Sequence, residues 1–100
     1  FYSIKYEHMD FLSNFAIPVI CKTQEIRDEL VRKCADKIEI RPVVGGNMAD
    51  QPFFKKYLTP NLKNIVSPNA SLIHQNGLYF GNNPELTQQE IAEIISIFTQ

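Results

Sequence analysis

Arg41 and the segment that follows it contain the residues best suited to bind a ligand. Residues 38 to 57 read IEIRPVVGGNMADQPFFKKY, so an arginine stands near the end of a strand-like run and a Gly-Gly-Asn loop comes soon after it. A guanidinium can fork onto a carboxylate or a phosphate, and paired glycines let a loop backbone approach an anion closely. From the residues alone, two interpretations stay open: an anion-binding loop, or a plain loop beside an exposed ion pair between Arg41 and Glu39.

No other group of residues in the sequence has the spacing of a complete catalytic site. Cys21 and Cys34 lack a Cys-x-x-Cys spacing, and His8 and His74 are equally scattered, so no metal-ligand pattern can be assembled. Both cysteines fall at apolar positions of predicted elements, which is typical of buried, reduced thiols in a cytoplasmic protein. The sequence therefore predicts neither a metal site nor a self-contained active site.

Composition limits the chain to one small domain and excludes some classes of partner. It has 100 residues, 44% of them hydrophobic, and a formal net charge of −1 from 10 basic and 11 acidic side chains. A chain of this length can bury one core, so we expect a single domain over residues 1–100, with 1–12 as a lead-in segment. Without a basic field, we expect no nucleic-acid partner. The longest apolar run, residues 15–21, is too short to cross a bilayer, so we expect no membrane insertion and a cytoplasmic location.

The first half of the chain predicts two strands around a helix. Residues 15–22 alternate as a strand, and Pro18 indicates that this strand lies at a sheet edge or that its proline nitrogen faces outward, because proline cannot donate to a ladder. Thr23 is the expected N-cap of a helix over about 24–36. A second strand is predicted over 38–44, with Arg41 held extended by the proline that follows it.

The second half predicts three helices and one strand. A short helix carries Pro52 in its first turn, and a polar connection over 58–66 leads to a helix over about 68–75 that Gly77 closes in a left-handed conformation. A strand over 78–80 follows. The last helix has a capping box of Thr87 and Glu90, a staple of Leu86 and Ile91, and an apolar stripe. The stripe consists of Ile91, Ile94, Ile95 and Phe98. This order of elements predicts an α+β domain in which helices cover a small sheet.

Three ordered blocks of the sequence resemble one known family. The segment IEIRPVVGGNMADQPFFKKY, the segment LSNFAIPVICKTQEIRDELVRKCADK over residues 12–37, and the segment NASLIHQNGLYFGNNPELTQQEI over 69–91 resemble the C-terminal small domain of the DegT/DnrJ/EryC1/StrS sugar-nucleotide aminotransferases. The resemblance covers nearly everything after residue 12. It implies a small, mainly antiparallel sheet covered by helices, as in the small domain of fold-type I pyridoxal-phosphate enzymes.

The resemblance also implies a function that this chain would share with a larger domain. Family members aminate keto-sugar nucleotides or, in a branch with histidine in place of the catalytic lysine, act as 3-dehydrases in the biosynthesis of lipopolysaccharide and other surface glycans. The lysine or histidine and the other ligands of pyridoxal phosphate belong to the large domain, so none is expected here. By position, Arg41, Asn47 and Gln51 are the expected substrate-binding residues.

The implied partners are the large domain of the same protein, the sugar nucleotide and a second subunit of a homodimer. The sequence does not decide between aminotransferase and dehydrase. The alternative interpretation is a stand-alone binding or interaction domain that uses this fold without a cofactor.

The loop over residues 45–49 is expected to be mobile, because no core residue precedes Phe53 to anchor it.

Overall fold

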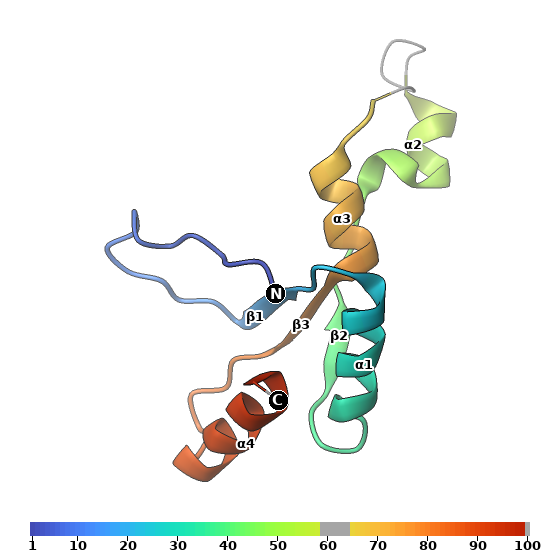
Figure 1. Ribbon diagram of the computed structural model, residues 1–100. Helices are drawn as coiled ribbons and strands as arrows, with labels where there is room; N and C mark the ends of the chain where they lie inside the picture. Colours follow the sequence, from blue (N-terminus) through green and yellow to red (C-terminus); the bar gives the residue numbers. More distant parts are fainter. Residues whose placement is uncertain (59–64, 100) are drawn as a thin grey trace.

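A three-stranded antiparallel sheet forms the centre of this small α+β domain (Figure 1). The computed structural model describes residues 1–58 and 65–99. The strands are β1 (Ala16–Ile20), β2 (Ile40–Pro42) and β3 (Gly77–Gly81), and their spatial order is β1-β3-β2. Both neighbours of β3 run antiparallel to it, so the last strand in sequence is the central one.

Two helices pack against the same face of this sheet. These are α1 (Gln24–Cys34) and α4 (Gln88–Thr99). The buried cluster joins Leu30 and Cys34 of α1 to Leu78 of β3 and to Cys21, and Ile97 and Phe98 of α4 pack against it. Burial of these side chains is the main force that holds the helices to the sheet. The core therefore lies between one sheet face and two helices.

The remaining helices form an arm that extends from one end of the sheet (Figure 1). This arm contains the 3₁₀ helix η1 (Met48–Asp50), α2 (Pro52–Tyr57) and α3 (Pro68–Asn76), which leads directly into β3. Residues 1–14 form no helix or strand and are tied to β1 by a hydrogen bond from the Tyr2 amide to the Ile20 carbonyl. The principal extents are 52 × 34 × 21 Å and the radius of gyration is 16.2 Å. A 100-residue domain of ordinary shape has a radius of about 13 Å, so this chain is extended.

Several sequence predictions are confirmed. Pro18 lies in β1, which is an edge strand. Thr23 caps α1, since its hydroxyl oxygen accepts from the Ile26 amide at 3.3 Å. Thr87 and Glu90 form the expected capping box: the Thr87 amide donates to Glu90 Oε2 at 2.7 Å and the Glu90 amide donates to Thr87 Oγ1 at 3.2 Å. Local capping chemistry thus placed the starts of both long helices correctly.

Other element predictions were wrong in extent or conformation. The second strand is Ile40–Pro42 rather than 38–44, because Pro42 removes a donor and the chain then turns at Gly45 and Gly46, both with positive φ. Gly77 is not left-handed; its φ of −85° and ψ of 138° make it the first residue of β3. Most of the predicted polar connection, residues 59–64, lies outside the described residues.

The apolar stripe of α4 is only partly covered. Ile94 and Phe98 are half-buried, whereas Ile91 and Ile95 are exposed, Ile95 at 55%. No helix within residues 1–58 and 65–99 is long and apolar enough to cross a membrane.

Candidate functional site

Arg41 lies on the face of the sheet opposite the core. In the strand register Arg41 pairs with Tyr79, which in turn pairs with Pro18, while Ile40 pairs with Phe80. Paired residues of antiparallel strands share a face and successive residues alternate, so Arg41 and Tyr79 point away from the face that α1 and α4 cover. The short strand β2 therefore presents the guanidinium next to an aromatic ring.

The guanidinium of Arg41 is held by the neighbouring carboxylate of Glu39. Arg41 Nε donates to Glu39 Oε1 at 2.8 Å, and Nη2 donates to the same oxygen. This hydrogen bond and charge, with a smaller contribution from the Tyr79 hydroxyl, raise the pKa of Arg41. The side chains of Arg41 and Glu39 are 62% and 74% exposed, so the ion pair contributes little to stability. The predicted pairing of Arg41 with Glu39 is confirmed.

Phe15 and Tyr79 form an aromatic corner beside the guanidinium. Their ring centroids lie 6.4 Å apart at an interplanar angle of 68°. Phe15 is 86% exposed, which is unusual for a phenylalanine that already has an aromatic neighbour. We call Phe15, Glu39, Arg41 and Tyr79 together the Arg41 surface. It presents the guanidinium of Arg41 and the exposed ring of Phe15 on the same side of the sheet.

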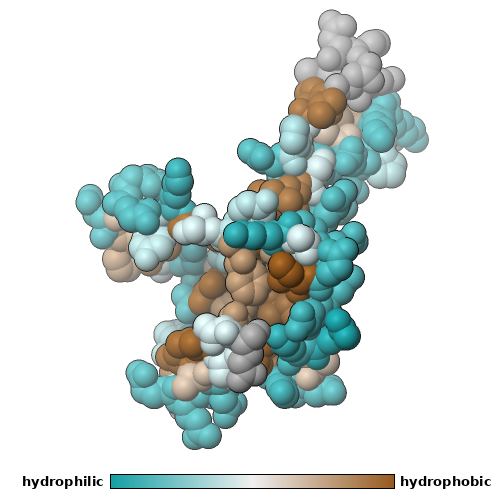
Figure 2. All heavy atoms as spheres, in the orientation of Figure 1, coloured by the Kyte–Doolittle hydropathy of each residue, from teal (hydrophilic) through white to brown (hydrophobic). Residues whose placement is uncertain are grey.

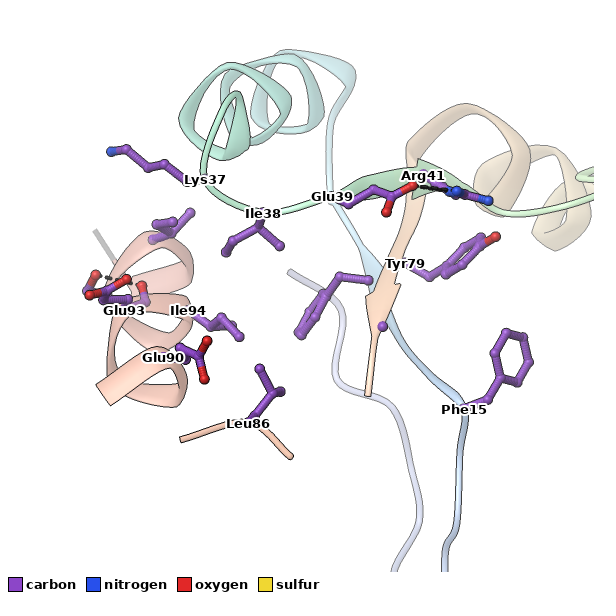
Figure 3. A pocket seen from close by; sticks show the side chains of 14 residues that line it. Phe15, Lys37, Ile38, Glu39, Arg41, Tyr79, Leu86, Glu90, Glu93 and Ile94 are labelled. Carbon is purple, nitrogen blue, oxygen red and sulfur yellow. Dashed lines mark hydrogen bonds and ion pairs between the residues drawn. The ribbon is translucent and has the colours of Figure 1, made fainter. Parts of the chain in front are cut away.

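The Arg41 surface forms one side of a cavity of about 740 Å³. Its remaining lining comes from α4 and the turn before β2, and Figure 3 shows that Glu90, Glu93 and Ile94 lie on the opposite side of β3 from the side chains of Arg41 and Tyr79. A Cβ on Gly81, which also lines the cavity, would meet no atom within 4 Å. This volume is within the range of small-molecule sites.

Asn47 is placed differently from Arg41, as a buried anchor of the loop. It is 3% exposed, and its Nδ2 donates both to Asp50 Oδ2 at 3.1 Å and to Ser71 Oγ at 2.9 Å. Its Oδ1 accepts from the Ala49 amide at 3.1 Å, which makes Asn47 the N-cap of η1. No apolar core residue was expected to anchor the loop before Phe53, and the structure shows a polar anchor there instead, the buried side chain of Asn47.

The same loop also packs closely on α3 through its second glycine. A Cβ on Gly46 would lie 1.8 Å from His74 Nδ1, and the φ of Gly46 is +49°. Only glycine fits this position without moving the imidazole. The glycine pair thus serves a tight turn and a close approach to α3.

Gln51, the third predicted site residue, caps α2 through its backbone. Its carbonyl accepts from the Phe54 amide at 3.1 Å, and its side chain makes no capping hydrogen bond. Gln51 and Asn47 lie at the two ends of η1, whereas only Arg41 lines the cavity. The structure thus brings two of the three predicted residues together and leaves the third on the sheet.

Sequence reasoning missed Phe15, Tyr79 and Ser71. The alternation of Leu78, Tyr79 and Phe80 indicates that the tyrosine faces away from its apolar neighbours. Nothing local assigns Phe15 to the same face, because it lies just before β1 and departs from the alternation of the strand. The link of Ser71 to Asn47 spans 24 positions and has no sequence signal.

The residues that line the cavity do not fit pyridoxal phosphate or a metal ion. Lys37 is the one lysine among the lining residues, and the cofactor phosphate would meet Glu39, Glu90 and Glu93 there. The part of the chain that the structure describes holds no group of three or more His, Cys, Asp or Glu side chains arranged for a metal. Cys21 and Cys34 are buried free thiols whose pKa values burial raises, which makes them poor nucleophiles.

No protein-family model, no curated protein and no solved structure matches the chain.

Proposed function

We propose that this chain is the C-terminal small domain of a cytoplasmic, pyridoxal-phosphate-dependent sugar-nucleotide aminotransferase or 3-dehydrase. In this proposal it acts in the biosynthesis of deoxyamino sugars for lipopolysaccharide or other surface glycans, closes over the active site of a larger domain, and is inactive alone. The resemblance of three ordered sequence blocks suggests the family. The α+β architecture with an antiparallel sheet is compatible with it.

The observation that carries the proposal is the large apolar surface of the described residues. Five hydrophobic side chains are buried, whereas nineteen large hydrophobic side chains are exposed. Figure 2 shows part of this surface as brown patches in the middle of the molecule and along α3. Single exposed apolar residues are normal, but apolar surface on this scale indicates contact with another protein surface. A large domain of the same protein would supply that contact.

A second cavity is the place where we expect the large domain to make this contact. It measures about 670 Å³ and lies between the N-terminal segment, β1 and α4. Its lining is mainly apolar and includes the exposed Ile95 together with Ile4, Leu12 and Ile17. We expect the large domain to insert side chains here, because their burial would remove this surface from water.

The three substrate residues have separate roles in this proposal. Arg41, exposed on the sheet, supplies a fixed positive charge for an anionic group of the sugar nucleotide. Asn47 holds the loop in position through Ser71, so that Gln51 and the backbone around the glycines can face the substrate. Pyridoxal phosphate, bound to the large domain, would supply the electron sink for the chemistry.

Kinetics of the intact enzyme test the proposal. Arg41→Ala should lower kcat/KM at least about tenfold with the cofactor retained, because a charge-assisted hydrogen bond is lost. Arg41→Lys should restore it only in part, since an ammonium lacks the fork geometry. Arg32→Ala, at an exposed arginine of α1, is the matched control and should have no effect. Unchanged turnover in Arg41→Ala, or stoichiometric pyridoxal phosphate binding by the 100-residue chain alone, would overturn the proposal.

A stand-alone binding domain is the second candidate, and the cavity beside Arg41 favours it. A site of about 740 Å³ with its own charged and aromatic residues can hold a ligand without a second domain. The gene decides between the two: an upstream large domain with its lysine or histidine supports the enzyme, and a start codon near Phe1 supports the binding domain.

A further inference from the structure

We propose that α2 of one molecule docks into a groove beside α4 of a second copy of this chain. The groove is the part of the cavity of about 740 Å³ that lies on the core side of the sheet, between α4 and the turn before β2. The aromatic side chains of α2 pack on its apolar floor, and the lysines of α2 face the carboxylates of α4. This inference goes beyond the proposed function, which assigns contacts to a large domain and none between copies of these 100 residues.

The groove beside α4 has an apolar floor and an acidic side. The floor consists of Ile38, Phe80, Leu86, Ile94 and Ile97. Figure 3 shows Ile38 across this space from Ile94. Glu90 and Glu93 belong to the α4 side of the groove. Residues 65–100 contain three glutamates and no lysine or arginine, so no cation on this stretch of the chain offsets these charges. The groove therefore fits a helix that is basic and carries large apolar side chains.

The helix α2 carries such a set of side chains. Phe53 and Tyr57 lie one turn apart on the same face and are 49% and 73% exposed. Lys55 and Lys56 are also exposed, and Nζ of Lys56 lies 5.1 Å from the centroid of the Tyr57 ring. Residues 52–57 contain no acidic side chain, and none of the ion pairs among the described residues involves either lysine. The helix thus presents two aromatic anchors with positive charge beside them.

The shape of the molecule keeps α2 away from its own groove. Figure 1 shows α2 and α4 at opposite ends of the molecule, whose longest extent is 52 Å. Two copies placed antiparallel bring each α2 beside the α4 of the other, so both contacts can form around a two-fold axis. Strand pairing between copies is disfavoured, because each edge strand contains a proline, Pro18 in β1 and Pro42 in β2. The complementary charges at the two ends of one chain therefore identify a second copy as the occupant.

Sedimentation velocity of the 100-residue chain at low salt and up to millimolar concentration tests the proposal. The wild type should form a dimer. Lys56→Glu and Glu93→Lys should each weaken association at least about tenfold, because like charges then face one another across both contacts. An equimolar mixture of these two variants should restore the dimer, since opposite charges then meet at both contacts.

An anchor variant and two matched controls complete the test. Tyr57→Ala should weaken association at least about fivefold, because it removes an aromatic anchor. Tyr6→Ala truncates a tyrosine that is 58% exposed in the N-terminal segment, and Lys22→Glu reverses the charge of an exposed lysine outside α2. Both controls should associate like the wild type. All of the substituted side chains are exposed, so every variant should keep the wild-type circular dichroism spectrum.

Three results would overturn the inference. The first is a wild-type chain that stays monomeric at millimolar concentration. The second is a mixture of Lys56→Glu and Glu93→Lys that associates no better than either variant alone. The third is equal weakening by Lys22→Glu and Lys56→Glu, which would show that overall charge governs association. The proposed function does not depend on these results, because turnover of the intact enzyme tests it separately.

Discussion

The side-chain amide of Asn47 donates a hydrogen bond to the hydroxyl of Ser71 at 2.9 Å, which ties the loop after β2 to α3. The other donor bond of the same amide goes to Asp50, and its oxygen accepts from the Ala49 amide. One buried side chain thus satisfies three polar groups around it. Because buried polar groups are costly when unpaired, Asn47 is a structural centre of the arm.

Asn47→Ala should therefore destabilise the protein. We expect a loss of about 1–3 kcal/mol in the free energy of unfolding, since the N-cap of η1 is removed and the half-buried Ser71 hydroxyl and Ala49 amide lose their partner. Urea denaturation followed by circular dichroism measures this. Asn69→Ala, at an exposed asparagine in the first turn of α3, is the control and should change the free energy by less than about 0.5 kcal/mol. Equal stability of the two variants would contradict the anchoring role.

Ser71→Ala separates anchoring from substrate contact at Asn47. In the intact enzyme this variant keeps the amide and removes its link to α3. If Asn47 acts by positioning the loop, Ser71→Ala should lower turnover in the same direction as Asn47→Ala, with the cofactor retained. Wild-type turnover in Ser71→Ala beside impaired turnover in Asn47→Ala would assign a direct substrate contact to the amide instead.

Thr87→Ala should weaken the start of α4. The hydroxyl of Thr87 accepts from the Glu90 amide and donates to the Glu90 carboxylate, so its loss should cost about 1 kcal/mol in the free energy of unfolding. Thr87→Ser retains the hydroxyl and should restore most of this loss. Denaturant midpoints compared at constant m-value provide the measurement, and an unchanged midpoint in Thr87→Ala would refute the capping role.

The same capping box should make the free energy of unfolding depend on pH. Hydrogen bonds from the backbone and then the side chain of Thr87 lower the pKa of Glu90 below its ordinary value. Folding therefore favours the carboxylate: the contribution is present above the unfolded pKa of about 4 and is lost as the pH falls through the lower folded pKa. The stability difference between wild type and Glu90→Gln should shrink as the pH drops from neutral through that range. A difference independent of pH would exclude this linkage.

Local chemistry predicted much of the fold and little of the candidate site. Thr23, Thr87 and Pro18 each act on their nearest neighbours, so their caps and edge position follow from a few residues of sequence. The bond between Asn47 and Ser71 depends on how α3 folds back over the loop, and the corner of Phe15 and Tyr79 depends on strand register. Such long-range relationships have no local signature, which is why Asn47 was not expected to anchor the loop.

Gly77 shows at a single position that a long-range contact cannot be predicted from local sequence. Its glycine character was attributed to a left-handed cap, but its φ is −85°. The reason lies in packing: a Cβ there would be 2.3 Å from the Ile73 carbonyl oxygen and 3.0 Å from Val43 Cγ2. Gly77→Ala should therefore destabilise the protein by about 1–3 kcal/mol, because backbone must move at the junction of α3 and β3.

Gly81 at the other end of β3 is the matched control. It belongs to the same strand, has no positive φ, and has open space where a Cβ would lie. Gly81→Ala should be neutral or stabilising by up to about 1 kcal/mol, since alanine reduces the entropy of the unfolded chain. Thermal unfolding of both variants tests the pair. If Gly77→Ala and Gly81→Ala unfold at the same temperature, the close contact between α3 and β3 does not constrain this junction.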